Sequence, residues 1–213
     1  MKNYGKLITG IIVVWFISVL SASALHLFKN NANRIGVEVA IAAVTPPIVV
    51  FSVWFGVSGK FRQFALSLNP RTLTAVQSWG FVGFTFVLLE ARGVLPAIFA
   101  WPAGYGDMAI GVTASFVAWK LANADHRNSF ILWQVLGILD LVNAVGVGTT
   151  AGLLSPQGPS MAAMTVLPLS LIPTFLVPLF LMLHVICIVQ ARGWKVFPAR
   201  TRQTASPAQQ PAI

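Results

Sequence analysis

The chain has 213 residues, of which 56% are hydrophobic and only 9% are charged. An ordinary soluble domain carries a charge on about a quarter of its residues, so this composition excludes a soluble globular domain and indicates an integral membrane protein. The formal net charge of +9 does not indicate a nucleic-acid partner, because the basic residues lie at the ends of long apolar runs, where they orient membrane spans. The single cysteine, Cys187, excludes an internal disulfide and a metal site built on paired cysteines.

Six segments are expected to cross the membrane. About 20 apolar residues, each adding about 1.5 Å of helix, cover the roughly 30 Å of hydrocarbon in a bilayer. In chain order, the segments that satisfy this length are Leu7 to Leu27, Val37 to Val57, Leu73 to Ala91, Ala103 to Leu121, Phe130 to Thr149 and Val166 to Val189. The predicted fold class is therefore all-α, a polytopic transmembrane helical bundle that occupies residues 1–196.

The connections between these segments carry signals of their own. Since proline interrupts helices, the stretch from Gly93 to Pro102 is expected to form a short outer loop or turn. After the second expected span, apolar residues recur at helical spacing beside basic ones, which predicts a short helix lying on the inner membrane surface: Phe61, Phe64, Ala65 and Leu68. Residues 197–213 are rich in Pro, Ala, Gln and Thr and are expected to be a disordered cytoplasmic tail.

The basic residues predict the orientation of the bundle. With six spans, one side holds eleven of them: Lys2, Lys6, Lys60, Arg62, Arg71, Lys120, Arg127, Arg192, Lys195, Arg200 and Arg202. The other side holds three, Lys29, Arg34 and Arg92. Because cytoplasmic loops are enriched in Lys and Arg, this asymmetry predicts that both termini are cytoplasmic.

The N-terminal segment has a second interpretation. Lys2, Lys6, the apolar run that follows and the small residues Ala22 to Ala24 are also typical of a secretory signal with its cleavage site. Removal of residues 1–24 would leave five spans. A retained span is favoured, because the apolar run continues to Phe28.

Acidic residues are few, and four of the five lie within or at the ends of expected spans: Glu38, Glu90, Asp107 and Asp140. A carboxyl group in a span costs several kcal/mol unless it faces protein, has a partner or is protonated, so such groups are candidate functional residues. Asp107 shares a helical face with Gly104 and Gly111, and Asp140 shares one with Gly137, with Asn143 one position aside. Small residues mark helix contacts, so both aspartates are expected to point into the bundle.

Histidines extend this set. His184 lies in the inner half of the sixth expected span, which also holds Pro168, Pro173 and Pro178, and prolines kink helices at binding sites. The expected depths descend from the outer side in steps of about 6 Å. The resulting candidate path is Glu90, Asp107, Asp140, Asn143 and His184, and the candidate outer-rim polar residues are His26, Glu38, Arg92 and Tyr105. For each, the structural alternative is a helix-end charge, an interfacial side chain or an interhelical hydrogen bond.

Three functions remain open on this basis. The first is a transporter of a small solute or ion, coupled to protons or cations, in which the carboxyl groups and His184 form the path. The second is a membrane-embedded enzyme or a metal- or cofactor-binding protein acting on a lipid-soluble substrate. A metal there would be held by Asp107, Asp140 and His184, and no spacing identifies a cofactor. The third is a non-catalytic accessory subunit whose polar groups only hold helices together. Separately, the small-residue faces are candidate surfaces for an oligomer.

Two segments resemble parts of uncharacterised bacterial inner-membrane proteins. They are Phe99 to Asp107, with the sequence FAWPAGYGD, and Pro168 to His184, with three prolines. The resemblance implies a multi-pass protein of the bacterial inner membrane, and it implies no activity.

Overall fold

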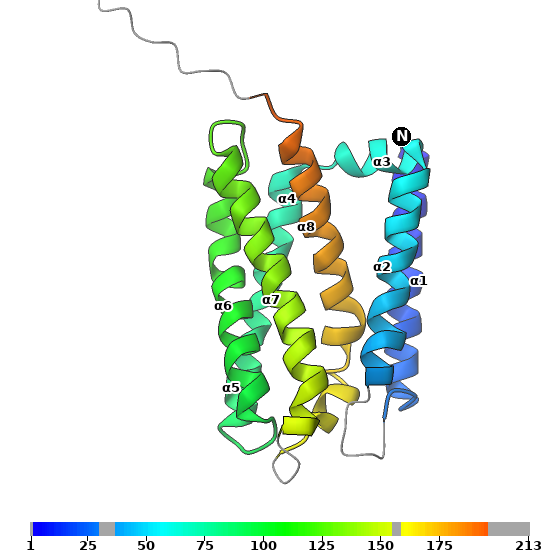
Figure 1. Ribbon diagram of the computed structural model, residues 1–213. Coiled ribbons are helices and arrows are strands. Elements are labelled where there is room, and N and C mark those ends of the chain that lie inside the picture. Colours follow the sequence, from blue (N-terminus) through cyan, green and yellow to red (C-terminus); the bar gives the residue numbers. More distant parts are fainter. Residues whose placement is uncertain (1, 30–36, 155–158, 196–213) are drawn as a thin grey trace, which may run out of the picture.

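The computed structural model describes residues 2–29, 37–154 and 159–195, and every regular element in these ranges is a helix (Figure 1). Eight α-helices are formed there: α1 (Lys2–Ala24), α2 (Val37–Val57), α3 (Gly59–Leu66), α4 (Pro70–Val76), α5 (Phe84–Glu90), α6 (Ala97–Lys120), α7 (Arg127–Leu154) and α8 (Val177–Arg192). Two tighter turns are η1 (Gln77–Gly83) and η2 (Met161–Thr165), and η3 (Ile172–Leu176) is a wider π-helical turn. The expected tail, 197–213, lies outside the described residues.

The helices form a bundle (Figure 1). α4, η1 and α5 follow one another along it, and α6, α7 and α8 pack beside them, with α1 and α2 at one edge. The start of α1 and the end of α8 lie at the same end of the bundle, together with α3. An apolar cluster around Phe61 and Phe130 fills that end, and a second one around Phe86 and Phe99 fills the other.

Among the described residues, four helical segments are long and apolar enough to cross a membrane: Tyr4–Ala24, Pro70–Glu90, Arg127–Ala151 and Ile172–Arg192. A fifth is added if α2 and α3, which meet at an angle of 103°, count as one bent span. α6, which has 24 residues and holds Asp107, is not among these segments. The described residues thus confirm an all-helical fold with four or five segments long and apolar enough to cross a membrane.

α3 is the short helix expected after the second span. Ser58 caps its N-terminus by accepting a hydrogen bond from the backbone N–H of Phe61. Phe61 and Ala65 are buried against the bundle, and Phe61 stacks on Trp54 with ring centroids 4.3 Å apart. The helical spacing of the apolar residues therefore correctly predicted the helix, and two of the four residues, Phe61 and Ala65, form its buried face.

The loop expected from Gly93 to Pro102 is shorter than predicted. α6 begins at Ala97, after the N-cap residue Pro96, so Pro102 lies inside the helix. Pro102 lies near the start of the helix, just beyond the first turn, where it removes only one internal hydrogen bond. The turn itself depends on Gly93, whose φ of +69° is readily adopted only by glycine.

The sixth expected span also begins later and ends later than predicted. Its helical part runs from Ile172 to Arg192, and Met161–Thr165 forms a separate turn before it. Pro173 lies in the π-helical turn, and Pro178 lies in the first turn of α8. Proline frees backbone carbonyls and widens or bends a helix, which accounts for the irregular start of this span.

Candidate functional site

Asp107 lies where α6 packs most closely on η1. A Cβ atom added to Gly80 would be 2.9 Å from the backbone oxygen of Asp107, and one added to Gly83 would overlap the Asp107 side chain itself. A Cβ at Gly104 would be 2.8 Å from Val87. Glycines on both segments therefore allow the backbones to approach each other, and this contact holds Asp107 against η1, as the small-residue pattern predicted.

Asp140 reaches the same position from α7. Its carboxyl group lies directly over Gly106, where a side chain on α6 would overlap the Asp140 Oδ1 atom. The carboxyl groups of Asp107 and Asp140 are within hydrogen-bonding range of each other. The structure therefore brings together the two aspartates that the sequence singled out.

This pair has a defined chemistry. An ionised carboxylate only accepts hydrogen bonds, so two carboxyl groups bond to each other when one of them carries a proton. Two carboxylates that share a site commonly hold one proton between them, as in the aspartic-protease dyad. The Asp107–Asp140 pair can therefore release a proton when a cation arrives and take it up again when the cation leaves.

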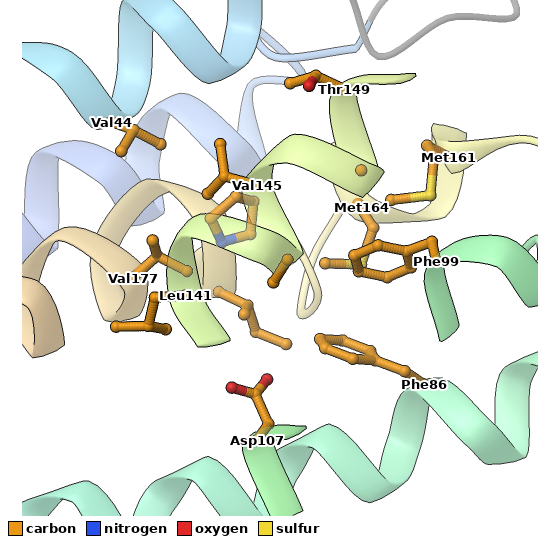
Figure 2. Close-up of a pocket in the computed structure, with 14 residues that line it drawn as sticks. Val44, Phe86, Phe99, Asp107, Leu141, Val145, Thr149, Met161, Met164 and Val177 are labelled. Carbon is orange, nitrogen blue, oxygen red and sulfur yellow. The ribbon is translucent and has the colours of Figure 1, made fainter. Parts of the chain in front are cut away.

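Two cavities meet at Asp107. The larger, of about 60 Å³, extends from Asp107 toward Met161 and Met164 (Figure 2). The smaller, of about 20 Å³, lies beside Gly80, Gly83 and Phe180. Both share a wall formed by Phe86, Asp107, Leu141, Ile172 and Val177. A water molecule needs about 10–15 Å³ measured in this way, so the larger cavity has room for several and the smaller for one.

Figure 2 shows how the larger cavity is built. The carboxyl group of Asp107 points into it from one end, and Thr149 lies at the opposite end. The side chains between them are apolar, including the rings of Phe86 and Phe99. Within the described residues, Asp107 is the one ionisable side chain that lines either cavity.

His184 belongs to a separate, fully buried polar cluster. Its Nδ1 atom lies 2.6 Å from the Oε1 atom of Gln134. The Nε2 amide of Gln134 donates to the hydroxyl of Thr74 at 3.1 Å, and the Nε2 amide of Gln77 donates to Gln134 Oε1 at 3.4 Å. Since Gln134 Oε1 can only accept, Nδ1 of His184 carries the proton of this bond. Thr74 also lies 3.8 Å from the Sγ atom of Cys187.

Gly137 makes room for the His184 ring. A Cβ atom at this position would overlap the imidazole and would be 3.0 Å from its Nδ1 atom. Gly137 and Asp140 are three residues apart on α7, so the histidine cluster and the aspartate pair lie about one helical turn apart along that helix. The two groups nevertheless use different neighbours, since Asp140 faces α6 and His184 comes from α8.

The remaining predicted residues do not join the aspartate pair. Asn143 is exposed on α7, Glu90 is half-buried at the end of α5, and Arg92 is exposed in the following turn. Tyr105 is exposed and packs edge-on against Trp101, and His26 is exposed with a φ of +56° just after α1. The side chain of Glu38, at the start of α2, lies outside the described residues.

The three residues considered as metal ligands do not gather at one site. In the described ranges, no three His, Cys, Asp or Glu side chains gather closely enough to hold a metal ion, so Asp107, Asp140 and His184 do not form the metal site considered above. The small-residue faces of α6 and α7 are occupied within the chain, by η1 and by His184.

Sequence reasoning missed the glutamines. Gln77 and Gln134 are completely buried, and Gln134 joins three segments of the bundle through its hydrogen bonds to Thr74, Gln77 and His184. Neither glutamine carries a charge, so a search for charged groups within the spans does not select them. The available signal was an amide side chain within an apolar span, because such a group requires partners inside the protein.

Fold and site together define an all-helical protein of membrane type with a carboxyl pair at the centre of its bundle. Residues 36–192 match the family model described as "Domain of unknown function (DUF8737)", and the chain belongs to this family. No curated protein and no solved structure matches the chain. The expected resemblance to an uncharacterised family is confirmed, and the matched region contains Asp107, Asp140 and both cavities.

Proposed function

We propose that this protein is a transporter of the bacterial inner membrane that exchanges protons for a small cationic solute at the Asp107–Asp140 pair. The observation that carries the proposal is the juxtaposition of two carboxyl groups in the middle of an apolar bundle. Intramembrane carboxyl groups are costly, and they mark ion pathways and proton relays in membrane proteins. A pair that holds one proton can alternate between a protonated and a cation-bound form, which is the basis of exchange.

The cavities support this proposal. Asp107 lines the larger cavity on one side and the smaller one on the other, so the same carboxyl group borders both spaces. Exchange across a membrane requires a binding group that is reached from each side in turn. The π-helical turn at Ile172–Leu176 lies in the shared wall and, with Pro173, is the irregular segment at which the wall can rearrange.

In this proposal six segments span the bilayer: α1, α2, the run from α4 to α5, α6, α7, and η3 with α8. The face of α6 that holds Asp107 packs against η1, α5 and α7, so its lower hydropathy is compatible with a span. Both termini are cytoplasmic, because the basic residues are concentrated at the end of the bundle where α1 starts and α8 ends. Asp125, in the turn after α6, lies at that end as well.

The test is proton flux in proteoliposomes that contain the purified full-length protein. A pH gradient is imposed, a pH-sensitive dye reports the lumen, and sodium, potassium or an alkylammonium salt is added outside. Asp107→Asn and Asp140→Asn keep the shape of each side chain but remove its charge, and each is expected to slow cation-dependent proton flux at least about tenfold. Asp125→Asn, at an exposed position, is the matched control and keeps the wild-type rate.

Helical content and detergent resistance are measured for every variant, so that a loss of flux is not mistaken for a loss of fold. Unchanged flux in correctly folded Asp107→Asn or Asp140→Asn protein would exclude exchange at this pair. The absence of cation-dependent proton flux in the wild-type protein, with every salt, would exclude the proposed function altogether.

A further inference from the structure

The few polar groups in the larger cavity restrict which ligands it can bind. Among the described residues that line it, Asp107 and Thr149 are the ones with polar side chains. The Thr149 hydroxyl already donates its proton to the backbone oxygen of Gly146 at 2.9 Å, so it has only lone pairs to offer to a ligand. Asp107, once its proton is lost, also only accepts hydrogen bonds. A ligand that fits must therefore donate, which disfavours anions.

The walls do not suit a bare divalent metal ion. Hard cations such as Mg²⁺ or Ca²⁺ require six or more oxygen ligands, whereas this cavity offers the oxygens of two side chains at opposite ends. The walls between these ends consist of hydrocarbon, the rings of Phe86 and Phe99, and the thioethers of Met161 and Met164. Aromatic faces attract organic ammonium groups, and methionine adapts to irregular apolar shapes.

Size gives a further restriction. The cavity measures about 60 Å³, and one water molecule, which is close in size to a methylene group, needs about 10–15 Å³ on this measure. The cavity therefore holds about four to six non-hydrogen atoms. An alkylamine of this size is protonated near neutral pH, as the amine of lysine is.

We propose that the cavity binds a small primary alkylammonium ion, with its charged nitrogen at Asp107 and its alkyl chain between Phe86, Phe99 and the two methionines. This inference rests on the proposed function and names its substrate class. Arrival of the ammonium group displaces the proton that Asp107 shares with Asp140, so that binding and proton release are coupled at one pair of carboxyl groups.

The test uses n-butylammonium, whose four carbons and one nitrogen match the cavity. Calorimetry on the purified protein in detergent, repeated in two buffers that differ in ionisation enthalpy, measures both affinity and proton release. Butylammonium is expected to bind with release of about one proton, and n-butanol, which has the same shape without charge, is expected to bind at least about thirtyfold more weakly. Tetrabutylammonium, which is far too large for the cavity, is expected not to bind.

Two variants locate the site. Asp107→Asn is expected to weaken butylammonium binding at least about thirtyfold, whereas Asp125→Asn leaves it unchanged. Ala144→Leu fills the cavity from α7 and is expected to weaken binding at least about tenfold, whereas Ala109→Leu, at an exposed position of α6, has no effect. Variants that do not fold are replaced by the smaller changes Asp107→Ser and Ala144→Val.

The outcomes separate this inference from the proposed function. Equal binding of butanol and butylammonium, or binding that survives Asp107→Asn, would overturn the inference. So would the absence of butylammonium binding in a protein that exchanges protons for sodium or potassium, and the transport function would then stand without it. Binding with proton release but without flux in proteoliposomes would support the site and exclude the transport function.

Discussion

The contact between Gly106 and Asp140 offers a direct test of the aspartate pair. A Cβ atom at Gly106 would lie 2.7 Å from the Cγ atom of Asp140, whereas carbon atoms pack best at about 3.5–4.0 Å. In Gly106→Ala, either the Asp140 side chain rotates away from Asp107 or α6 and α7 separate. Overpacking of this kind costs about 1–3 kcal/mol. Alanine in place of a helical glycine contributes about 0.5–1 kcal/mol of stability, so the net loss expected is about 0–2.5 kcal/mol.

Repeating the substitution in an Asp140→Ala variant isolates the effect of the overlap between Gly106 and Asp140. In Asp140→Ala the overlapping carboxyl group is gone, so Gly106→Ala is expected to be neutral or stabilising there, and the double-mutant coupling energy should equal the overpacking cost of about 1–3 kcal/mol. Gly146→Ala is the matched control, since nothing lies within 4 Å of a Cβ at that position of α7. Free energies of unfolding are measured by titration from mild detergent into sodium dodecyl sulfate. A coupling energy near zero, or equal effects at Gly106 and Gly146, would refute the placement of Asp140 over Gly106.

Three further predictions concern the histidine cluster. Gly137→Ala is expected to destabilise the fold by about 1–3 kcal/mol through its overlap with the His184 ring, and the loss should disappear in a His184→Ala background, measured by the same titration. Gln134→Ala leaves buried partners without hydrogen bonds and is expected to lower the free energy of unfolding by about 3 kcal/mol or more. The exposed Gln63→Ala is expected to lower it by about 0.5 kcal/mol or less, and equal losses would contradict the network. Cys187, which is completely buried, is expected to react with N-ethylmaleimide at least about a hundredfold more slowly in the folded than in the unfolded protein, as followed by mass spectrometry, and rapid labelling of folded protein would contradict its burial.

Hydropathy and helical periodicity predicted much of this architecture. The spans over Pro70–Glu90 and Arg127–Ala151 lie within a few residues of their expected positions, because long apolar runs have no stable alternative to a helix in a membrane. The faces of Asp107 and Asp140 were also predicted correctly. A helix contact requires small residues on one face, and Gly104, Gly111 and Gly137 mark those faces in the sequence.

The direct contact between the two aspartates could not be predicted in this way. Successive residues of a helix point about 100° apart, so Gly106 lies on a different face of α6 from its neighbour Asp107. Asp140 approaches α6 over Gly106 and reaches Asp107 from the side. That approach depends on the rotation of α7 relative to α6, which the periodicity of either helix alone does not contain.

The expected descent of polar groups through the membrane depended on the predicted span bounds, and the helix bounds differ from them. Because α6 starts at Ala97 instead of residue 103, its midpoint moves about three or four residues toward Asp107, a shift of about 5 Å. α7 is centred close to Asp140, and the span over Ile172–Arg192 is centred within about 3 Å of His184. The three groups thus occupy nearly one level of the bundle, so they do not form a chain of steps across it. A solute path across the membrane must therefore include cavities on both sides of that level. Of these three residues, Asp107 is the one that borders the two cavities. This is why we assign the exchange of protons to the aspartate pair and a structural role to the hydrogen bonds of His184.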